Sequence, residues 1–440
     1  MSKMLPQTIQ FSSLSRHKIE AQFSGGHITS DAGLLLLREV DRQLGLTDRL
    51  ARKLVDWRES GKVKHSLKAM LRQRLLGIAA GYSDLNDHTQ LRQDMALQTS
   101  VESLQMLASC STLCRFESQM DRQSILDAHQ CLWEQFIASH KTPPKRVVLD
   151  FDATDIPLHG DQPEKFFHGY YDHYCYLPLY VFSDRFPLVA YLRPSKIDGA
   201  KHTAAILKLL VTFIRQHWPE VQIVFRGDSG FCRQLVLNWC DRNGVDYIVG
   251  IARNPRLEAM INRSWDYVES QHQQRKAMGI KGATRCFWRY TYQADSWKHP
   301  REVIAKIEVT DKGRNPRFIV TSLPGRDSKL YCEEYCARGD MENRIKDQQL
   351  DLFAKCTSSK HWWSNQWRLT LSMLAFVLFE QLREHCSNKY DTLSVQNLRL
   401  KLIKIAAVVV TNTRRIRFLL SECCPDQKEF TRLVERLLPS

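Results

Sequence analysis

Apolar and polar positions follow two different patterns along the chain. In the first 140 residues, apolar side chains recur every three to four positions, as in DAGLLLLREVDRQLGL and HSLKAMLRQRLLGIAAGY. This spacing is typical of amphipathic helices. After the linker KTPPK at 141–145, the pattern changes to short, nearly continuous apolar runs that are rich in β-branched residues, which indicates buried strands. The sequence therefore predicts a helical N-terminal region followed by an α/β domain.

The α/β domain has a predicted order of three strands, a helix, a strand, a helix and a strand. The predicted strands are 146–152, 177–182, 187–192, 221–225 and 246–251, and the helices are 203–217 and 233–243. A polar segment follows, in which we expect a strand pair at 285–292 and 301–309. The core pattern then returns with a strand at 318–323 and helices at 328–350 and 361–384.

These changes of pattern divide the chain into five predicted regions. They are a helical region at 1–140, the first part of an α/β core at 141–251, a β-rich insertion at 252–317, the second part of the core at 318–385 and a basic helical tail at 386–440. The fold class is therefore α/β with added helical regions.

The charge of the chain indicates a polyanionic partner. Of its 440 residues, 63 are Lys or Arg and 48 are Asp or Glu, a formal net charge of +15. Nucleic acid is the first candidate. Between Arg49 and Arg74 nine basic residues face only two acidic ones, Asp56 and Glu59. This stretch is either a solvated helix face or a DNA-facing surface, and charge alone does not separate the two.

Cysteine usage and hydropathy exclude two other classes of protein. The 13 cysteines include no Cys-x-x-Cys pair, and their odd number excludes a complete disulfide framework, so a reducing cytosol fits best. The most apolar stretch, 369–379, is too short for a bilayer span, which needs about 20 apolar residues.

Acidic residues lie on one predicted strand and at the end of another, and these residues are candidates for a catalytic site. Asp150 and Asp152 alternate along the first predicted strand, so both side chains point to one face. A carboxylate pair in an apolar strand is costly unless it is hydrogen-bonded or binds a metal, although exposure at the strand end is the alternative. Asp228 follows another strand at its carboxyl end, where open α/β sheets place their sites.

A third acidic position lies on the predicted helix 328–350. Tyr335, Arg338 and Glu342 share one helix face, and Lys346 follows one turn later. Arg and Tyr beside a Glu could clamp a phosphate while the Glu binds a metal, or the pair could be an ordinary surface ion pair. Carboxylates that converge from two strands and a helix are suited to two divalent metals and phosphoryl transfer, and oxygen ligands favour Mg²⁺ or Mn²⁺.

Together these blocks resemble the DDE transposases of bacterial insertion sequences, which have an RNase H-like catalytic core. More narrowly, the sequence looks like the thirteen-eighty group within the wider IS-four-like superfamily. The motifs on which this resemblance rests are DFDATD at 150–155, FRGDSGF at 225–231 and the Tyr-x2-Arg-x3-Glu spacing of Tyr335, Arg338 and Glu342. Segments 81–94, 111–117 and 168–182 also look typical of the group, so the resemblance covers most of the chain.

The resemblance implies roles for individual residues. Asp152, Asp228 and Glu342 would form the catalytic metal-binding triad for two Mg²⁺ or Mn²⁺ ions, with Asp150 as the alternative first ligand and Asp155 as a weaker one. The residues implied to contact DNA are Tyr335, Arg338, Lys346, Arg226 and the aromatic residues Trp288 and Trp297 of the insertion, one of which would stack on a flipped base. The alternative for both Trp residues is ordinary core packing. Many relatives carry Lys seven positions after the Glu, and here that residue is Gln349.

The function implied by the resemblance is DNA transposition in the bacterial cytoplasm, in association with the nucleoid. The protein would bind the terminal inverted repeats of its element as a homodimer on paired ends, cut there, and join the freed 3′-hydroxyl to target DNA. Region 1–140 would then serve DNA binding and dimerisation. Two alternatives remain open: a structure-specific nuclease of the same fold, and a transposase-derived DNA-binding protein that no longer cuts.

Overall fold

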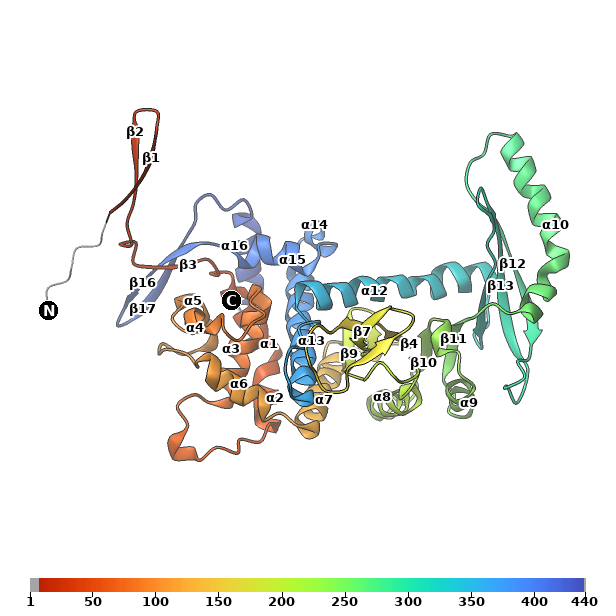
Figure 1. Cartoon of the computed structure of the whole chain (residues 1–440), viewed down its shortest axis with the longest axis horizontal. Coiled ribbons are helices and arrows are strands. Elements are labelled where there is room, and N and C mark those ends of the chain that lie inside the picture. Colours follow the sequence, from red (N-terminus) through yellow and green to blue (C-terminus); the bar gives the residue numbers. More distant parts are fainter. Residues whose placement is uncertain (1–7, 439–440) are drawn as a thin grey trace. The chain divides into compact units, whose positions relative to one another are not determined.

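The computed structural model describes residues 8–438, which divide into two compact units (Figure 1). The sheet unit comprises residues 125–350 and 354–373, and the helical unit comprises the described residues before 125 together with 351–353 and 374–438. The boundary between the units falls inside helix α13 (Trp362–His385). Within residues 8–438, no helix combines the length and the apolar character that crossing a membrane requires.

A mixed sheet of nine strands organises the sheet unit. Along its main path the strand order is β12-β13-β15-β11-β10-β4-β8-β9, and β14 pairs with β13. The strands are β4 (Arg146–Ala153), β8 (Leu179–Ser183), β9 (Phe186–Tyr191), β10 (Gln222–Gly227), β11 (Asp246–Ile251), β12 (Thr284–Tyr292), β13 (Arg301–Thr310), β14 (Gly313–Arg314) and β15 (Arg317–Thr321). The three central strands β4, β10 and β11 are parallel to one another, and the outer pairings are antiparallel.

The alternation of side chains in the central strands decides which face carries chemistry. Leu149 and Phe151 of β4 pack in the main apolar core, which includes side chains of α7 (Arg122–Ala138), α8 (Thr203–His217), α9 (Gln234–Arg242) and α10 (Pro255–Ala277). Asp150 and Asp152 therefore point to the opposite face. A second apolar cluster covers that face, where Val224 of β10 packs near Leu330 and Tyr331.

The helical segment over this second face is irregular. It comprises α11 (Asp327–Lys329), a π-helical turn η3 (Leu330–Tyr335), a 3-10 turn η4 (Cys336–Arg338), α12 (Gly339–Lys346) and a second π-helical turn η5 (Asp347–Asp351). The sequence predicts one regular helix at 328–350, so the change of helical pitch is a finding of the structure. Departures of this kind in a helix are frequent at functional sites.

The predicted β-rich insertion is only partly β. Its first third forms the long helix α10, which Asn254 caps by accepting a hydrogen bond from Leu257 N and which begins with Pro255. Its two long strands β12 and β13 extend the central sheet through β15. Region 252–317 is therefore built into the sheet unit. A small sheet of β5 (Ile156–Pro157), β6 (Phe166–His168) and β7 (His173–Tyr176) completes this unit.

The helical unit combines both ends of the described chain. Its elements are β1 (Ile9–Leu14), β2 (His17–Ala21), β3 (His27–Thr29), α1 (Leu34–Leu44), α2 (Leu46–Lys53), η1 (Ser60–Lys62), α3 (Leu67–Ala80), α4 (His88–Leu91), α5 (Met95–Val101), α6 (Cys110–Ser118), α14 (Asn388–Asp391), α15 (Val395–Leu398), η6 (Arg399–Ile403), β16 (Ala407–Asn412), β17 (Arg415–Leu420) and α16 (Gln427–Leu437).

Two segments of the helical unit differ from the predicted helices. The hairpin β1-β2 precedes the helices, and β3 pairs with β16, which in turn pairs with β17. The β-branched run Val408–Val410 favours a strand over the predicted helical tail. Because β3 and β16 share a sheet, the tail and the N-terminal region fold as one unit.

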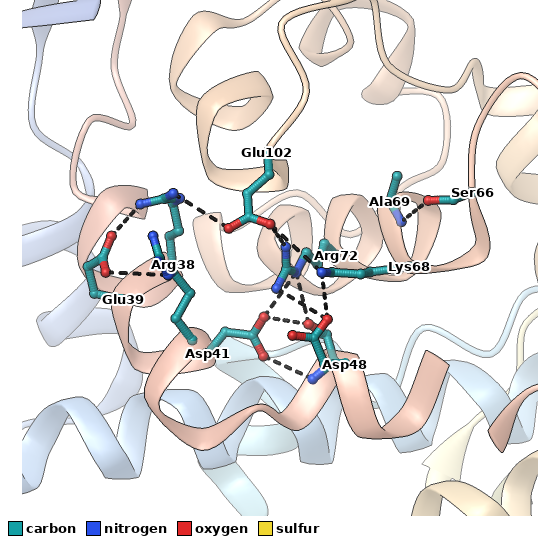
Figure 2. Close-up of polar contacts among 11 residues, drawn as sticks. Arg38, Glu39, Asp41, Asp48, Ser66, Lys68, Ala69, Arg72 and Glu102 are labelled. Atoms are coloured by element: carbon teal, nitrogen blue, oxygen red, sulfur yellow. Dashed lines mark hydrogen bonds and ion pairs between the residues drawn. The ribbon is translucent and has the colours of Figure 1, made fainter. Parts of the chain in front are cut away.

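Ion pairs, including the buried pair of Arg72 and Asp41, connect the helices of this unit (Figure 2). Arg72 of α3 is 3% exposed and its Nε lies 3.1 Å from Asp41 Oδ2 of α1, while its Nη1 bonds to Glu102. Lys68 Nζ, one turn earlier, lies 2.6 Å from Asp48 Oδ1 of α2. Arg72 belongs to the basic stretch 49–74. Part of that stretch therefore stabilises the fold and does not face DNA.

Candidate functional site

Two of the predicted acidic residues lie on adjacent parallel strands. Asp152 is the penultimate residue of β4, and Asp228 directly follows β10. Gly227 pairs in register with Phe151, so Asp228 is level with Asp152 at the carboxyl edge of the sheet. Asp228 also caps the short helical turn η2 (Ser229–Phe231) by accepting a hydrogen bond of 2.8 Å from Gly230 N. The capping bond fixes the orientation of the Asp228 carboxylate.

The third acidic residue reaches the same place from the irregular helix. Glu342 lies on α12, and its Oε1 accepts a hydrogen bond of 2.9 Å from Arg338 Nη2. The other terminal nitrogen of Arg338 lies 4.0 Å from Asp152 Oδ1. The guanidinium of Arg338 therefore lies between two of the three predicted carboxylates.

The pKa of Asp152 shows that the three carboxylates interact. Burial has the largest effect on the pKa of Asp152, Arg338 lowers this pKa, and the negative charges of Asp228 and Glu342 raise it. Together these effects raise the pKa of Asp152 to about 7. Burial by itself lowers the pKa of Arg338, but Asp152 and the neighbouring acidic groups leave it raised overall. One cation is thus shared by three acidic groups, which leaves a local excess of negative charge.

Asp150 has a different environment although it is only two residues away. It is 1% exposed, and its carboxylate accepts two hydrogen bonds from Arg226, one of them 2.6 Å long. The two residues are register partners on β4 and β10. Arg226 also donates to the backbone carbonyl of Glu334. Arg226 is buried and all three of its side-chain nitrogens donate hydrogen bonds within the protein, so this geometry does not present Arg226 to DNA. The alternative ligand Asp150 is thereby paired with a cation.

Gly250 is a site residue that the sequence analysis missed. A Cβ atom at this position of β11 would lie 2.6 Å from Tyr335 Oη and 2.8 Å from the backbone N of Ser229. Tyr335 is therefore packed against the strand next to the Asp228 turn, and burial raises the pKa of its hydroxyl. The available signal was a glycine inside an otherwise apolar strand, which often marks close approach of another group.

Two further predicted positions have partners other than a phosphate or metal. Asp155 Oδ2 lies 2.8 Å from His173 Nε2, which gives the weaker ligand candidate a histidine partner. Gln349, which stands where many relatives have Lys, donates a hydrogen bond of 3.1 Å to the backbone carbonyl of Asp155. This bond ties the end of the irregular helix to the segment that follows β4.

The remaining predicted DNA contacts differ in exposure. Lys346 is exposed, one turn after Glu342. Trp288 is 44% exposed on β12, which lies at the end of the sheet. Trp297 is 6% exposed, and its ring packs against Tyr292 in the main core. The structure therefore leaves Trp288 accessible and gives Trp297 the role of a core residue.

The arrangement also bears on the predicted metal site. Among residues 8–438, no three His, Cys, Asp or Glu side chains are grouped closely enough to hold a metal ion as they stand. The chemistry of the donors fits a divalent cation nonetheless, because carboxylate oxygens are hard ligands and Asp152 is buried beside two other acidic groups. At present the positive charge there comes from Arg338.

A mixed α/β sheet that delivers acidic residues from separate elements to one edge is the type of site that metal-dependent phosphoryl-transfer enzymes use. The family model described as transposase DDE domain group 1 matches residues 11–440, and the chain belongs to this family of DNA-cleaving and DNA-joining enzymes.

Other comparisons add little to this assignment. No curated protein matches the chain significantly in sequence. One similar solved structure is the cryo-EM structure of a piggyBac transposase synaptic complex with hairpin DNA, at 11% identity and a TM-score of 0.39. The match covers 94% of this chain and 86% of that one. At this TM-score the likeness carries no argument about the site.

Proposed function

We propose that the protein cuts DNA at the ends of a bacterial insertion sequence of the thirteen-eighty type and joins the freed 3′-hydroxyl to target DNA. The observation that carries the proposal is the convergence of Asp152, Asp228 and Glu342 from β4, the end of β10 and α12. Asp152 and Asp228 are level on adjacent strands, and Arg338 bonds to Glu342 and lies 4.0 Å from Asp152. Cutting and joining are both in-line phosphoryl transfers, so one set of carboxylates serves both.

The strand arrangement supports an RNase H-like core. In chain order, β4, β8, β9, β10 and β11 are five consecutive core strands, and their spatial order is β9-β8-β4-β10-β11. The first strand is central, the second and third add antiparallel to one side, and the last two add parallel to the other. This is the arrangement that the sequence resemblance implies, with acidic residues on the first and after the fourth strand.

We assign Asp152, Asp228 and Glu342 as the ligands of two Mg²⁺ or Mn²⁺ ions. Bound there, the ions would lower the pKa of the attacking hydroxyl group and stabilise the charge on the leaving oxygen. Asp152 must lose its proton before it can bind a cation, and Asp228 is held in place by its bond to Gly230 N. We leave the alternative ligand Asp150 out of this set because it is paired with Arg226.

The DNA contacts that we propose follow from position beside the carboxylates for two residues and from exposure for two others. Arg338 and Tyr335 stand beside the carboxylates and would hold the phosphate next to the cut, and Lys346 would contact a neighbouring phosphate. Trp288 is the accessible aromatic for stacking on an unpaired base, which contributes about 1 to 3 kcal/mol. The partners are then duplex DNA, both inverted repeats and target, and a second copy of the chain on the paired ends.

The test is cleavage and strand transfer on DNA that carries the element's own ends, with Mg²⁺ or Mn²⁺. Asp152→Asn, Asp228→Asn and Glu342→Gln should each reduce both reactions at least about a thousandfold, since each removes a metal ligand, while end binding persists. The matched control is Asp172→Asn, the same chemical change at an exposed residue whose left-handed backbone (φ 57°) suits Asn.

The alternatives give different results in the same experiment. Cleavage without joining would favour a structure-specific nuclease. Tight end binding without any cleavage under either metal would favour a DNA-binding protein that has lost its activity. Full activity of all three variants would overturn the assignment of the ligands.

A further inference from the structure

The helical unit contains a basic pocket that lies outside the residues assigned to the carboxylate site. Its volume is about 440 Å³. The walls come from the segment before α3, from α3, from the residue that follows α4 and from α6. The lining residues are Arg58, Lys62, Lys64, His65, Met70, Arg92, Ser109, Thr112, Arg115, Phe116 and Gln119. Five of them are Lys or Arg and none is acidic, so the pocket attracts anions.

Three of the five cations are not neutralised by a carboxylate. Arg58 and Lys62 have acidic partners just outside the lining, Asp56 and Glu59. Lys64, Arg92 and Arg115 have no carboxylate partner among residues 8–438. Lys64 and Arg115 are exposed, and Arg92 is half-buried. Buried donors are normally satisfied, so the expectation of a partner applies to Arg92.

Arg92 gives the clearest sign of a missing partner. Its Nε atom is buried and donates no hydrogen bond in the part of the chain that the structure describes. A guanidinium binds phosphate oxygens through several N–H groups at once. The unsatisfied donor is thus of the kind that a phosphate would complete.

The start of α6 adds to the positive potential of the pocket. Ser109 caps this helix by accepting a hydrogen bond of 3.3 Å from Thr112 N, and both residues line the pocket. A helix N-terminus carries a partial positive charge. The hydroxyl groups of Ser109 and Thr112 lie 3.0 Å apart, so one donates to the other and the second can donate to an anion. The pocket therefore combines a helix terminus, a hydroxyl donor and unpaired cations.

The pKa of His65, which lines the pocket, agrees with the pocket geometry. Burial lowers this pKa, and the positive charges of Lys64, Arg92 and Arg58 lower it further. The three cations belong to different parts of the sequence, and all of them act on one imidazole ring. Their fields therefore add at one place.

The basic pocket differs from the other cations of the helical unit. Arg72 and Arg74 of α3 are buried, and each has a carboxylate partner, with 2.7 Å between Arg74 Nε and Glu117 Oε1. Their charges hold the unit together. The unpaired cations are instead gathered around an open cavity, and Trp57, one residue before Arg58, is 72% exposed. An exposed aromatic beside cations is a feature of nucleic-acid binding surfaces.

We propose that this pocket binds backbone phosphates of duplex DNA, as a DNA contact additional to those of the carboxylate site. The inference rests on the proposed function for the identity of the polyanion. The recognised chemistry is a phosphate diester, and free phosphate shares it. Several separated cations, the exposed Trp57 and the net charge of +15 favour a long polyanion over a small one.

The test is the salt dependence of binding to a fluorescent 30-base-pair duplex, measured by anisotropy with the full chain. Lys64→Ala, Arg92→Ala and Arg115→Ala are combined in one variant. Each phosphate contact contributes about 0.9 to the slope of log K against log salt, so the slope should fall by about 2 to 3 and the affinity by roughly a hundredfold. None of the three is ion-paired, so the variant should melt like the wild type.

The matched control is Arg16→Ala, Lys18→Ala and Lys428→Ala, which removes the same charge from exposed positions of the same unit. It should change the slope by less than about 1. A second variant, Gln119→Glu, adds a carboxylate to the pocket wall and should also weaken DNA binding. Equal losses in the triple variant and the control would overturn the proposal, and so would unchanged binding by the triple variant. Wild-type melting raised by inorganic phosphate, without any effect of the triple variant on DNA binding, would assign the pocket to a small anion.

The experiments can disprove the pocket proposal and the proposed function independently of each other. If the triple variant binds DNA like the wild type while cleavage depends on Asp152, the pocket proposal is wrong and the transposase stands. If the triple variant loses binding while the wild type never cleaves, the pocket stands and the proposed enzyme activity is wrong.

Discussion

The helical unit and the sheet unit both bury charged side chains, but they balance the charges differently. In the helical unit, Arg74 meets one carboxylate, Glu117. Arg72 contacts three carboxylates, but Lys68 and Arg38 share them, so three cations face three carboxylates there. At the edge of the central sheet, one guanidinium, Arg338, is shared by several carboxylates. Balanced pairs serve the fold, whereas an excess of one sign indicates a missing partner of the opposite sign.

The same contrast recurs within a single strand. Asp150 and Asp152 share one face of β4, yet Asp150 is matched by Arg226 and Asp152 lies beside other acidic groups. We therefore expect Asp150 to matter for stability and Asp152 for chemistry. Substitutions at the two positions separate these roles.

The largest effect on stability is expected from Asp150→Asn. The change leaves Arg226 buried without its counter-charge, and loss of one partner of a buried ion pair costs about 3 to 5 kcal/mol. Urea unfolding of the full chain measures the loss, with Asp172→Asn as the exposed control. Asp150→Leu combined with Arg226→Met should recover most of the stability, because apolar replacement of both partners is often neutral.

A different result would change the roles assigned to Asp150 and Asp152. If Asp150→Asn unfolds like the wild type but no longer cleaves DNA, Asp150 belongs to the reaction centre and the balanced-pair interpretation fails there. If Asp152→Asn is the variant that loses stability, the two residues have exchanged roles.

This pair also shows how far sequence reasoning reaches. The apolar runs predicted β4, β10 and β11 and the helix at 203–217 with nearly the observed bounds, because their burial patterns are encoded locally. The two strand carboxylates were found for the same reason. The partner of Asp150 was not, because it depends on the register between two strands that are 76 residues apart.

Long-range packing explains the other differences. Trp288 and Trp297 look alike in sequence, but Trp297 is covered by the main core and Trp288 lies on the last strand of the sheet. The predicted helical tail contains a strand because β3, near the other end of the chain, is there to pair with it. The roles that the resemblance gives to Asp152, Asp228 and Glu342 remain predictions until the variants are measured.

A smaller effect is expected from Gly250→Ala. The new Cβ would lie within 3 Å of both Tyr335 Oη and Ser229 N, so the turn that carries Asp228 or the helix that carries Tyr335 must shift. Overpacking of this kind costs about 1 to 3 kcal/mol. The shift should reduce DNA cleavage more than DNA binding, because it displaces a ligand and leaves the basic pocket unchanged. Urea unfolding and cleavage rates measure the two effects.

Gly169→Ala provides the control for this substitution. No atom lies within 4 Å of a Cβ built at Gly169, so the same added methyl group should change neither stability nor cleavage. Gly250→Ala with wild-type stability and cleavage would show that the close approach of Tyr335 has no part in the site.

The smallest effect, when it is compared over a single pH unit, comes from His88 in the helical unit and tests the balanced side of the comparison. Gln73 Nε2 and Arg74 Nη1 lie 3.1 and 3.2 Å from its two ring nitrogens, and the ring is fully buried. Burial and, to a smaller extent, the positive charge of Arg74 together lower the pKa of His88 to about 3. The folded protein therefore keeps His88 neutral at pH values where the unfolded chain, with a pKa near 6.5, binds a proton.

The sign of the pH dependence follows from this difference. Between pH 6.5 and about 3 the unfolded state binds one more proton at His88 than the folded state, so the free energy of unfolding decreases by about 1.4 kcal/mol per pH unit as the pH falls. His88→Gln lacks the titrating group, so its stability deficit relative to the wild type should shrink by that amount per pH unit below 6.5. Urea unfolding at several pH values measures it, and the exposed His17→Gln is the control. A deficit that stays constant with pH would mean that His88 is protonated in the folded state, and the buried charges around Arg74 would then carry an unbalanced positive charge like that of the basic pocket.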